Sequence, residues 1–434
     1  MAAALIATAV PTATGCASAG EQPGGNDNTS EQLVYLEGDI VWADSRWTDD
    51  GAAIVSELEL VADDGASIPI FQLGGVVDGV GMIASHHPEL LRTGQRLRGM
   101  AAPIAKAEAD DAGQRDDEQG YVLRSIMRDS SIMRDPSIMR DGEDGGTFGE
   151  ARYGINRTRQ TSTPLAWASG CIHLTFQDNG TSHLPGNSEF RLLENATGEW
   201  QNKTDACSDL AFSTAVSSDV GVGRNRINGV VFREDTWCRP ETATTPEVCH
   251  DARAIAVTQV FFIDDPDSPR DGTILEADIE FNAINFALSD DGQSLSDAPR
   301  SADLVSTATH ELGHALGLAH SCWNLVEERA SDHQGNPVAV CDDVPIGSEL
   351  REATMFPSQD DNETKKSSLE ASDILGVCVG MSEVSCDRVV RGGCSASSPG
   401  SAPTAALLML AVLGLVWRRR RPGGDLAKPL RGQR

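Results

Sequence analysis

The sequence is short of positive charge and of aromatic side chains, and each shortage argues against a class of protein. Lys and Arg number 35 against 65 Asp and Glu, which gives a formal net charge of −30. A field of that sign repels phosphate backbones and anionic lipid surfaces, so we expect no nucleic-acid partner. Aromatic residues make up only 5% of the 434 residues, which favours two or three modest folded units over one oversized core.

The ten cysteines include no CxxC pair, which argues against a zinc ribbon. Ten thiols are many for a reducing cytoplasm, so we expect an exported, oxidised protein. Setting aside Cys16 and Cys394 leaves eight cysteines for four disulfides. The sequence permits many pairings, and pairing between neighbours along the chain predicts Cys171–Cys207, Cys238–Cys249, Cys322–Cys341 and Cys378–Cys386.

Residues 1–19 are rich in alanine and carry no charge, and they resemble a secretory signal peptide. Two cleavage sites fit this segment. Cleavage before Cys16 would make that cysteine the lipidated first residue of a lipoprotein, whereas Ala17–Ala19 fits ordinary signal-peptidase cleavage. A disordered tail without a targeting role is the third possibility.

The tail at residues 383–434 contains Cys394, a spacer of small residues, an apolar run at 404–417 and the arginines 418–421. The run is shorter than the roughly 20 residues that a spanning helix needs. This order of features resembles the C-terminal sorting tails of myxobacterial surface proteins, which are cut near the cysteine and attached to the cell envelope. The arginines would stop transfer. A plain short membrane anchor is the alternative.

Between these ends the composition predicts three parts. Residues 20–103 hold short runs of strand-forming residues bounded by Gly and Asp, which predict a small all-β domain. Within it, the adjacent His86 and His87 would point in different directions, so we expect a solvated loop there and no metal site. Residues 104–160 contain three hexamers, SIMRDS, SIMRDP and SIMRDG, which are too short to bury a core and predict a linker. Residues 161–382 should form the larger domain.

In the larger domain we expect strands at 254–263 and 274–282 and a helix at 303–319. The helix contains His310-Glu311-Leu312-Gly313-His314. Residues i and i+4 share one helical face, so both imidazoles can bind one Zn²⁺.

Three further residues complete the predicted site. Glu311 follows the first ligand directly and can act as the base for a metal-bound water. Gly317 permits a left-handed turn that ends the helix, after which His320 can return as the third ligand.

The complete motif, HELGHALGLAH, is that of the metzincin zinc proteases, and Ser321 after it resembles the matrixin, or matrix metalloprotease-like, branch. The resemblance covers about residues 161–381. It implies an α+β catalytic domain with a mixed twisted sheet and a zinc-binding active-site helix. It also implies a methionine turn beneath the zinc, for which Met355 is the candidate, and structural Ca²⁺, for which the aspartates of 264–271 are candidates with a solvated turn as the alternative.

The resemblance implies an exported zinc endopeptidase that acts on protein or peptide substrates, with Glu311 as general base. We expect a monomer, attached to the cell envelope through its tail. A cell-surface binding or adhesion protein with an inactive or structural metal site is the alternative. Zinc ligation by Cys322 or Cys341 is an alternative to their disulfide. No segment resembles the matrixin cysteine switch, so latency stays open.

The tail generates the first testable prediction. We expect the mature protein to end near Cys394, with a modification there and with the apolar run removed. Cys394→Ala should then leave uncleaved protein in the membrane fraction without altering peptidase activity. The anchor alternative requires that the mature chain retains Arg434, so mass spectrometry of the mature C-terminus separates the two. Recovery of peptides from 418–434 in surface-exposed protein would rule out the sorting tail.

Overall fold

The structure is a computed structural model that describes residues 34–86, 91–104, 120–126, 153–242, 245–294, 300–323, 331–381 and 384–386. All of them belong to one compact unit, Met1–Asp387. Their two main features are a closed barrel and a larger mixed sheet.

The closed barrel has the strand order β1-β2-β3-β7-β6. Alternate residues of its strands point inward, and side chains such as Leu58, Leu60 and Ile70 fill a small core. β7 lies beyond residue 103, inside the segment that the sequence analysis assigned to the linker, so the barrel extends further along the chain than that boundary. The strands are β1 (Val34–Trp47), β2 (Ile54–Ala62), β3 (Ser67–Leu73), β6 (Arg96–Pro103) and β7 (Tyr121–Ile126).

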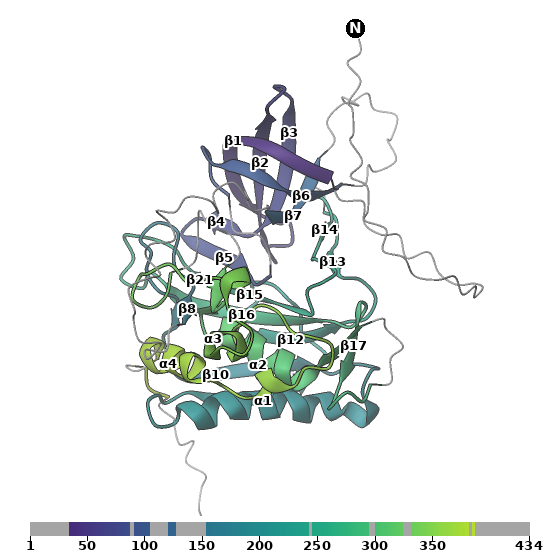
Figure 1. Cartoon of the computed structure of the whole chain (residues 1–434), viewed down its shortest axis with the longest axis vertical. Helices are drawn as coiled ribbons and strands as arrows, with labels where there is room; N and C mark the ends of the chain where they lie inside the picture. The colour runs from purple at the N-terminus through teal and green to yellow at the C-terminus, as the bar shows by residue number, and fades with distance from the viewer. Residues whose placement is uncertain are drawn as a thin grey trace, which may run out of the picture. The chain divides into compact units, whose positions relative to one another are not determined.

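The larger sheet has the order β11-β10-β12-β16-β15-β5-β4 (Figure 1). The strands from β11 to β16 pair in parallel, whereas β15 is antiparallel to β16 and buries all eight of its residues. Two strands from the N-terminal half extend the sheet beyond β15, because β5 pairs with β15 and β4 pairs with β5. The strands are β4 (Gly75–Val77), β5 (Val80–Ala84), β10 (Cys171–Gln177), β11 (Ala211–Ser217), β12 (Asn228–Arg233), β15 (Ala256–Ile263) and β16 (Thr273–Asn282).

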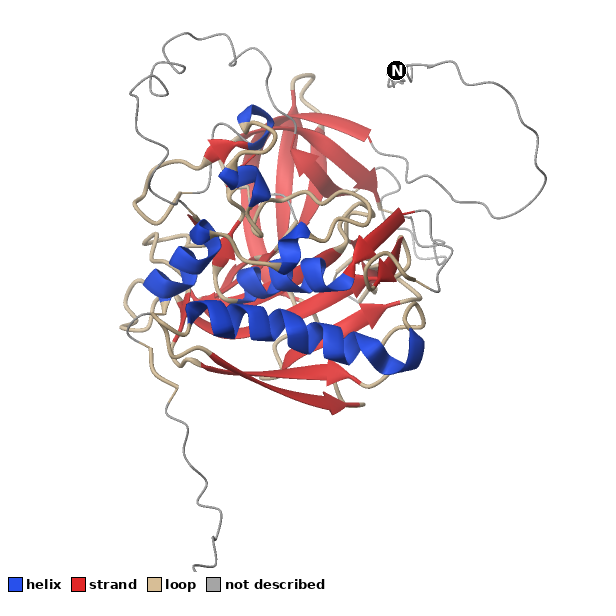
Figure 2. Cartoon of the chain, turned by 60° about the horizontal axis from the view of Figure 1, so that its bottom comes forward, coloured by secondary structure: helices blue, strands red, loops and turns tan. Residues whose placement is uncertain are grey.

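Helices α1 (Ser188–Thr204) and α2 (Leu304–Ala315) pack against one another beside this sheet (Figure 2). The fully buried Trp200 of α1 joins them, because its indole N–H donates to the Thr309 carbonyl of α2 at 2.8 Å. α2 begins after Asp303, whose carboxylate accepts from the Ser306 N–H at 2.8 Å as an N-cap. α1 was not predicted from the sequence.

The shorter elements tie the ends of the larger domain together. β8 pairs with β19, which brings residues before 161 against the chain that leaves α2, so the described domain begins before the predicted boundary. These elements are β8 (Gly154–Ile155), β9 (Ala166–Trp167), β13 (Cys238–Arg239), β14 (Val248–Cys249), β17 (Phe286–Ser289), β18 (Arg300–Asp303), β19 (Leu318–Ala319), β20 (Cys322–Trp323), β21 (Ala339–Val340), α3 (Glu349–Glu352) and α4 (Ala371–Gly380), with 3₁₀ turns η3 (Pro185–Asn187), η4 (Cys341–Asp343) and η5 (Lys365–Ser367).

Four disulfides connect the cysteines of the larger domain. The predicted pairs Cys238–Cys249 and Cys322–Cys341 are confirmed. The other two predicted pairs are wrong, because the structure joins Cys171 to Cys386 and Cys207 to Cys378.

The physical reason for the corrected pairing lies in the packing of the C-terminal part. α4 packs on α1, which brings Cys378 to the end of α1 where Cys207 lies. The Gly170 N–H donates to the Ser385 carbonyl at 3.2 Å, which places Cys386 beside Cys171. None of the described helices is long and apolar enough to cross a bilayer.

The pairing across 171 residues generates a stability prediction. Replacing both Cys207 and Cys378 with Ser should lower the free energy of unfolding by about 2–5 kcal/mol, because it releases a long loop in the unfolded chain. Replacing Cys238 and Cys249, which are separated by only 11 residues, is the matched control and should cost less. Denaturant unfolding measures both. A non-reduced peptide map that links Cys171 to Cys207 would contradict the pairing.

Candidate metal centre

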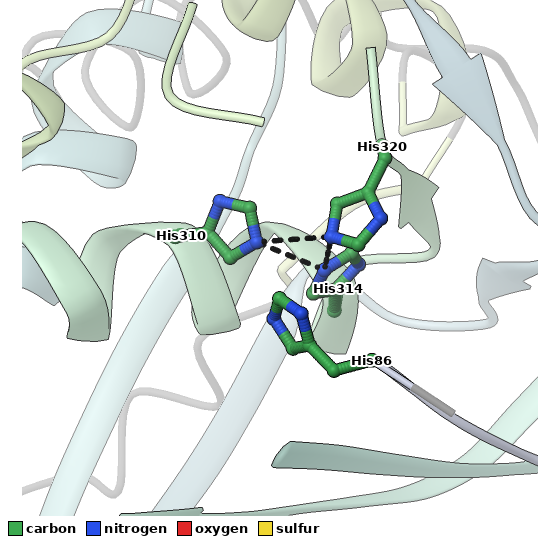
Figure 3. Close-up of side chains that lie close together, drawn as sticks. All are labelled: His86, His310, His314 and His320. Atoms are coloured by element: carbon green, nitrogen blue, oxygen red, sulfur yellow. Dashed lines mark hydrogen bonds between the residues drawn. The ribbon is translucent and has the colours of Figure 1, made fainter. Parts of the chain in front are cut away.

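The structure brings His310, His314 and His320 together at one point (Figure 3). Their Nε2 atoms lie 3.1 Å (His310 to His314), 3.2 Å (His314 to His320) and 3.3 Å (His310 to His320) apart. A tetrahedral ion with metal–nitrogen bonds of about 2.0–2.1 Å holds its ligands about 3.3 Å apart. The three nitrogens therefore fit the corners of one zinc coordination sphere.

Backbone carbonyl groups fix the orientation of two of these rings. The Nδ1 atom of His310 lies 2.6 Å from the Thr354 carbonyl oxygen, and that of His314 lies 2.9 Å from the Leu318 carbonyl oxygen. A carbonyl oxygen only accepts, so Nδ1 must carry the proton in each ring. Each Nε2 then presents its lone pair to the shared point, as a metal ligand requires.

Burial keeps the three rings uncharged. Desolvation lowers the pKa of His310 and of His320 well below the ordinary value and lowers that of His314 to about 4. At neutral pH the imidazoles therefore need not lose a proton before they bind a cation.

The helix that carries the first two histidines is shorter than the predicted helix at 303–319, because Leu318–Ala319 form β19 instead. α2 stops at Ala315, whose carbonyl accepts from the Trp167 indole N–H at 2.8 Å. Gly317 follows with φ +97°, and a Cβ there would meet the Leu165 carbonyl oxygen at 2.5 Å. Only glycine combines that backbone conformation with that close approach. This turn directs the chain back, so that His320 faces α2.

Met355, the candidate for the methionine turn, directly follows Thr354, whose carbonyl oxygen contacts His310. Its side chain is 1% exposed and packs against Gly313 of α2. The turn is held by Asp373, whose carboxylate accepts from the N–H groups of Thr354 at 2.9 Å and of Met355 at 3.2 Å. Asp373 lies in the first turn of α4 and was not singled out from the sequence, because nothing local connects it with residues about 20 positions earlier.

Glu311 is buried beside the metal-ligand set and keeps its negative charge. Burial alone would raise the pKa of its carboxyl, but the hydrogen bond from His86 and other contacts lower that pKa to about 2. The Thr258 hydroxyl donates to Oε2 at 2.6 Å, and the Ser85 hydroxyl donates to the same atom at 3.1 Å. Oε1 lies 3.2 Å from Nε2 of His86.

His86 is the residue that the sequence analysis missed. It was expected in a solvated loop, but the structure places it with the three zinc-ligand candidates, each of the four offering a ligand atom within 4.8 Å of the others. The expectation was wrong because β5 pairs with β15, which packs against α2, and no local sequence pattern reveals this long-range pairing. His87 lies outside the described residues.

The other predicted sites have different outcomes. Cys16 and Cys394 lie outside the described residues. Cys322 and Cys341 are joined to each other, so neither offers a thiolate to zinc. Calcium binding at 264–271 stays a prediction. Among the described residues, the groups spaced for a metal are the four histidines and Cys238–Glu247–Cys249, of which the cysteines are already bonded to each other.

Comparison with protein-family models, with curated proteins and with solved structures finds no match to this chain. The arguments below therefore depend on the residues and their geometry.

The contact between Gly313 and Met355 generates a prediction. A Cβ at Gly313 would meet Met355 Sδ at 2.2 Å and Trp200 Cζ2 at 3.0 Å, so Gly313→Ala should lower the free energy of unfolding by about 1–3 kcal/mol and weaken zinc binding. Gly198→Ala in α1 is the matched control. Its Cβ would have only Asn202 near it, at 3.9 Å, so it should raise the free energy by about 0.5–1 kcal/mol. Denaturant unfolding and chelator competition measure the two effects, and equal stabilisation by both would contradict the packing.

Proposed function

We propose that the chain is an exported zinc endopeptidase of matrixin type, in which His310, His314 and His320 hold the metal. The observation that supports this most is the convergence of three Nε2 atoms 3.1–3.3 Å apart beside an ionised, buried Glu311. When bound, zinc would supply Lewis-acid activation of a water and of the scissile carbonyl.

Glu311 would handle the protons of peptide hydrolysis. The Thr258 hydroxyl at 2.6 Å fixes Oε2, and Oε1, which His86 Nε2 contacts at 3.2 Å, would be the oxygen that takes the proton of the attacking water once His86 has moved away. The same carboxyl would deliver that proton to the leaving amine. The tight hold on Oε2 orients the carboxylate, which is what a general base in a fixed position requires.

β15 offers a place for the substrate backbone. It runs beside α2, antiparallel to β16, and Thr258 in this strand donates to Glu311. An extended peptide can add to such a sheet edge through main-chain hydrogen bonds, which leaves side-chain pockets to set specificity. In the structure this edge of β15 is paired with β5.

The four disulfides are consistent with an oxidising compartment, and with the signal-peptide resemblance they support export. Envelope attachment through Cys394 and a monomeric state remain part of the proposal.

One observation favours the alternative of a cell-surface binding protein with a structural metal. Structural zinc sites are closed by four protein ligands, whereas catalytic sites keep one position open. His86 offers a nitrogen within 4.8 Å of those of the other three histidines, which makes it the candidate for a fourth ligand. The activity of Glu311 variants separates the two functions, because a structural site has no use for a base.

Metal removal and two substitutions test the proposal. The protein should bind about one zinc per chain, and peptide hydrolysis should be lost to 1,10-phenanthroline and restored by Zn²⁺. Glu311→Gln should keep the zinc and lower kcat/KM at least 100-fold, roughly what loss of a general base costs. His314→Ala should lose both metal and turnover. Elemental analysis and a peptide assay measure these effects, and a folded, zinc-free protein that still hydrolyses peptides would refute the assignment.

A further inference from the structure

We propose that His86 is a fourth metal ligand, and that through it the N-terminal segment 75–86 holds the peptidase in a closed state of low activity. The part about low activity rests on the proposed function, whereas the part about metal ligation does not. Nothing in the sequence motif assigns His86 a role.

The position of the His86 ring supports the ligand assignment. Its centroid lies 4.9 Å from that of His320, 5.5 Å from that of His310 and 5.9 Å from that of His314, so it is in contact with all three rings (Figure 3). A ligand nitrogen of His86 lies within 4.8 Å of the ligand nitrogens of the other three. An imidazole has two nitrogens, so the same ring can contact Glu311 and the metal.

The backbone at His86 is held in an unusual conformation. Its φ of +59° lies in the left-handed region, which residues other than glycine adopt infrequently. The strain is of order 1 kcal/mol or more and persists only where the surroundings impose it. This turn ends β5 and directs the imidazole toward the three other histidines.

Glu311 is occupied by the same segment. The Ser85 hydroxyl donates to Oε2 at 3.1 Å, and His86 Nε2 lies 3.2 Å from Oε1, so both carboxylate oxygens are in contact with it. Ser85 is itself locked to the neighbouring strand, because its hydroxyl accepts from the Thr258 N–H at 2.7 Å and its own N–H donates to the Thr258 carbonyl at 2.9 Å. A carboxylate engaged in this way is not free to take a proton from water.

β5 also covers the edge at which we expect a substrate. It pairs antiparallel with β15 from Gln259↔Ala84 to Ile263↔Val80. Met82 is fully buried, and a Cβ at Gly81 would meet the Phe262 ring at 2.4 Å, so this strand fits closely against its neighbour. One segment thus blocks the substrate edge, the base and the fourth ligand position.

A single cut in the chain would allow the segment to be released. The sequence has no cysteine between Cys16 and Cys171, so no disulfide connects residues 17–170 to the larger domain. A cut in the stretch 127–152, which holds most of the hexamer repeat, would leave only non-covalent contacts between the N-terminal fragment and the larger domain.

The test compares full-length wild type with His86→Asn, His86→Ala and the control His173→Ala. Asn tolerates a positive φ and lacks the imidazole, so His86→Asn removes the ligand with little backbone change. His86→Ala repeats the test with a side chain that cannot coordinate. His173 is exposed on β10 and bonds Ser213, so its replacement removes an imidazole remote from the metal-ligand set.

The first readout is metal coordination, which does not depend on activity. Replacing zinc with Co²⁺ and recording the visible spectrum, together with X-ray absorption at the zinc edge, reports the number of imidazole ligands. We expect four imidazoles in wild type and His173→Ala, and three with one oxygen ligand in both His86 variants. Chelator competition should show zinc bound at least tenfold more weakly by the His86 variants. Identical coordination in wild type and both His86 variants would overturn the ligand assignment.

The second readout is peptide hydrolysis by the same proteins. A further full-length protein carries a recognition site for a specific protease among the hexamers, so that it can be cut there. Both His86 variants and the cut protein should exceed uncut wild type at least tenfold in kcat/KM. Wild type as active as the His86 variants would refute the closed state of low activity. The His86 variants could also lose one imidazole ligand while none of these proteins hydrolyses peptides. That result would support His86 as a metal ligand and would refute the peptidase function.

Discussion

Three uncharged imidazoles whose lone pairs converge on one point are the constraint on which the rest of the larger domain depends. With Nε2 atoms 3.1–3.3 Å apart, these lone pairs repel one another unless a cation lies between them. The fold must therefore impose the arrangement. It does so by holding α2 against α1 through Trp200, by placing Met355 beneath Gly313, and by fixing two rings through backbone carbonyls. The disulfides of the C-terminal part keep α4, and with it Asp373, in place behind the methionine turn.

Much of this arrangement could be predicted from the sequence because it depends on local geometry. The i, i+4 spacing of His310 and His314 determines that they share a helical face, and Gly317 supplies the only backbone that allows the tight return. The strands β15 and β16 could be predicted from their runs of branched and aromatic residues. The helix α1 could have been found as well, since Leu193, Ala196 and Trp200 follow helical spacing and are all buried.

The remaining features depend on pairings between distant segments. Cys171 and Cys207 lie close in sequence, but each bonds a cysteine more than 170 residues further on, because packing of α4 on α1 outweighs proximity along the chain. In the same way, β5 follows barrel strands and has a similar composition, yet it joins the other sheet. Whether His86 is solvated or lies beside the three other histidines depends entirely on that choice, and a sequence pattern within β5 contains no information about its partner strand.

The covalent continuity of residues 86 and 153 has a thermodynamic consequence that no contact distance reveals. While the chain is whole, β5 meets β15 as an intramolecular partner, at an effective concentration on the order of millimolar for a typical tether. After a single cut the same contacts become bimolecular, and each tenfold drop in protein concentration below that level shifts the balance toward separation by about 1.4 kcal/mol. Nanomolar concentration lies about six tenfold steps below millimolar, so the free-energy shift is about six times that value. Hydrolysis of one peptide bond, followed by dilution, would therefore favour dissociation of β5 from β15 through the gain in translational entropy, although the contacts between the two strands are unchanged.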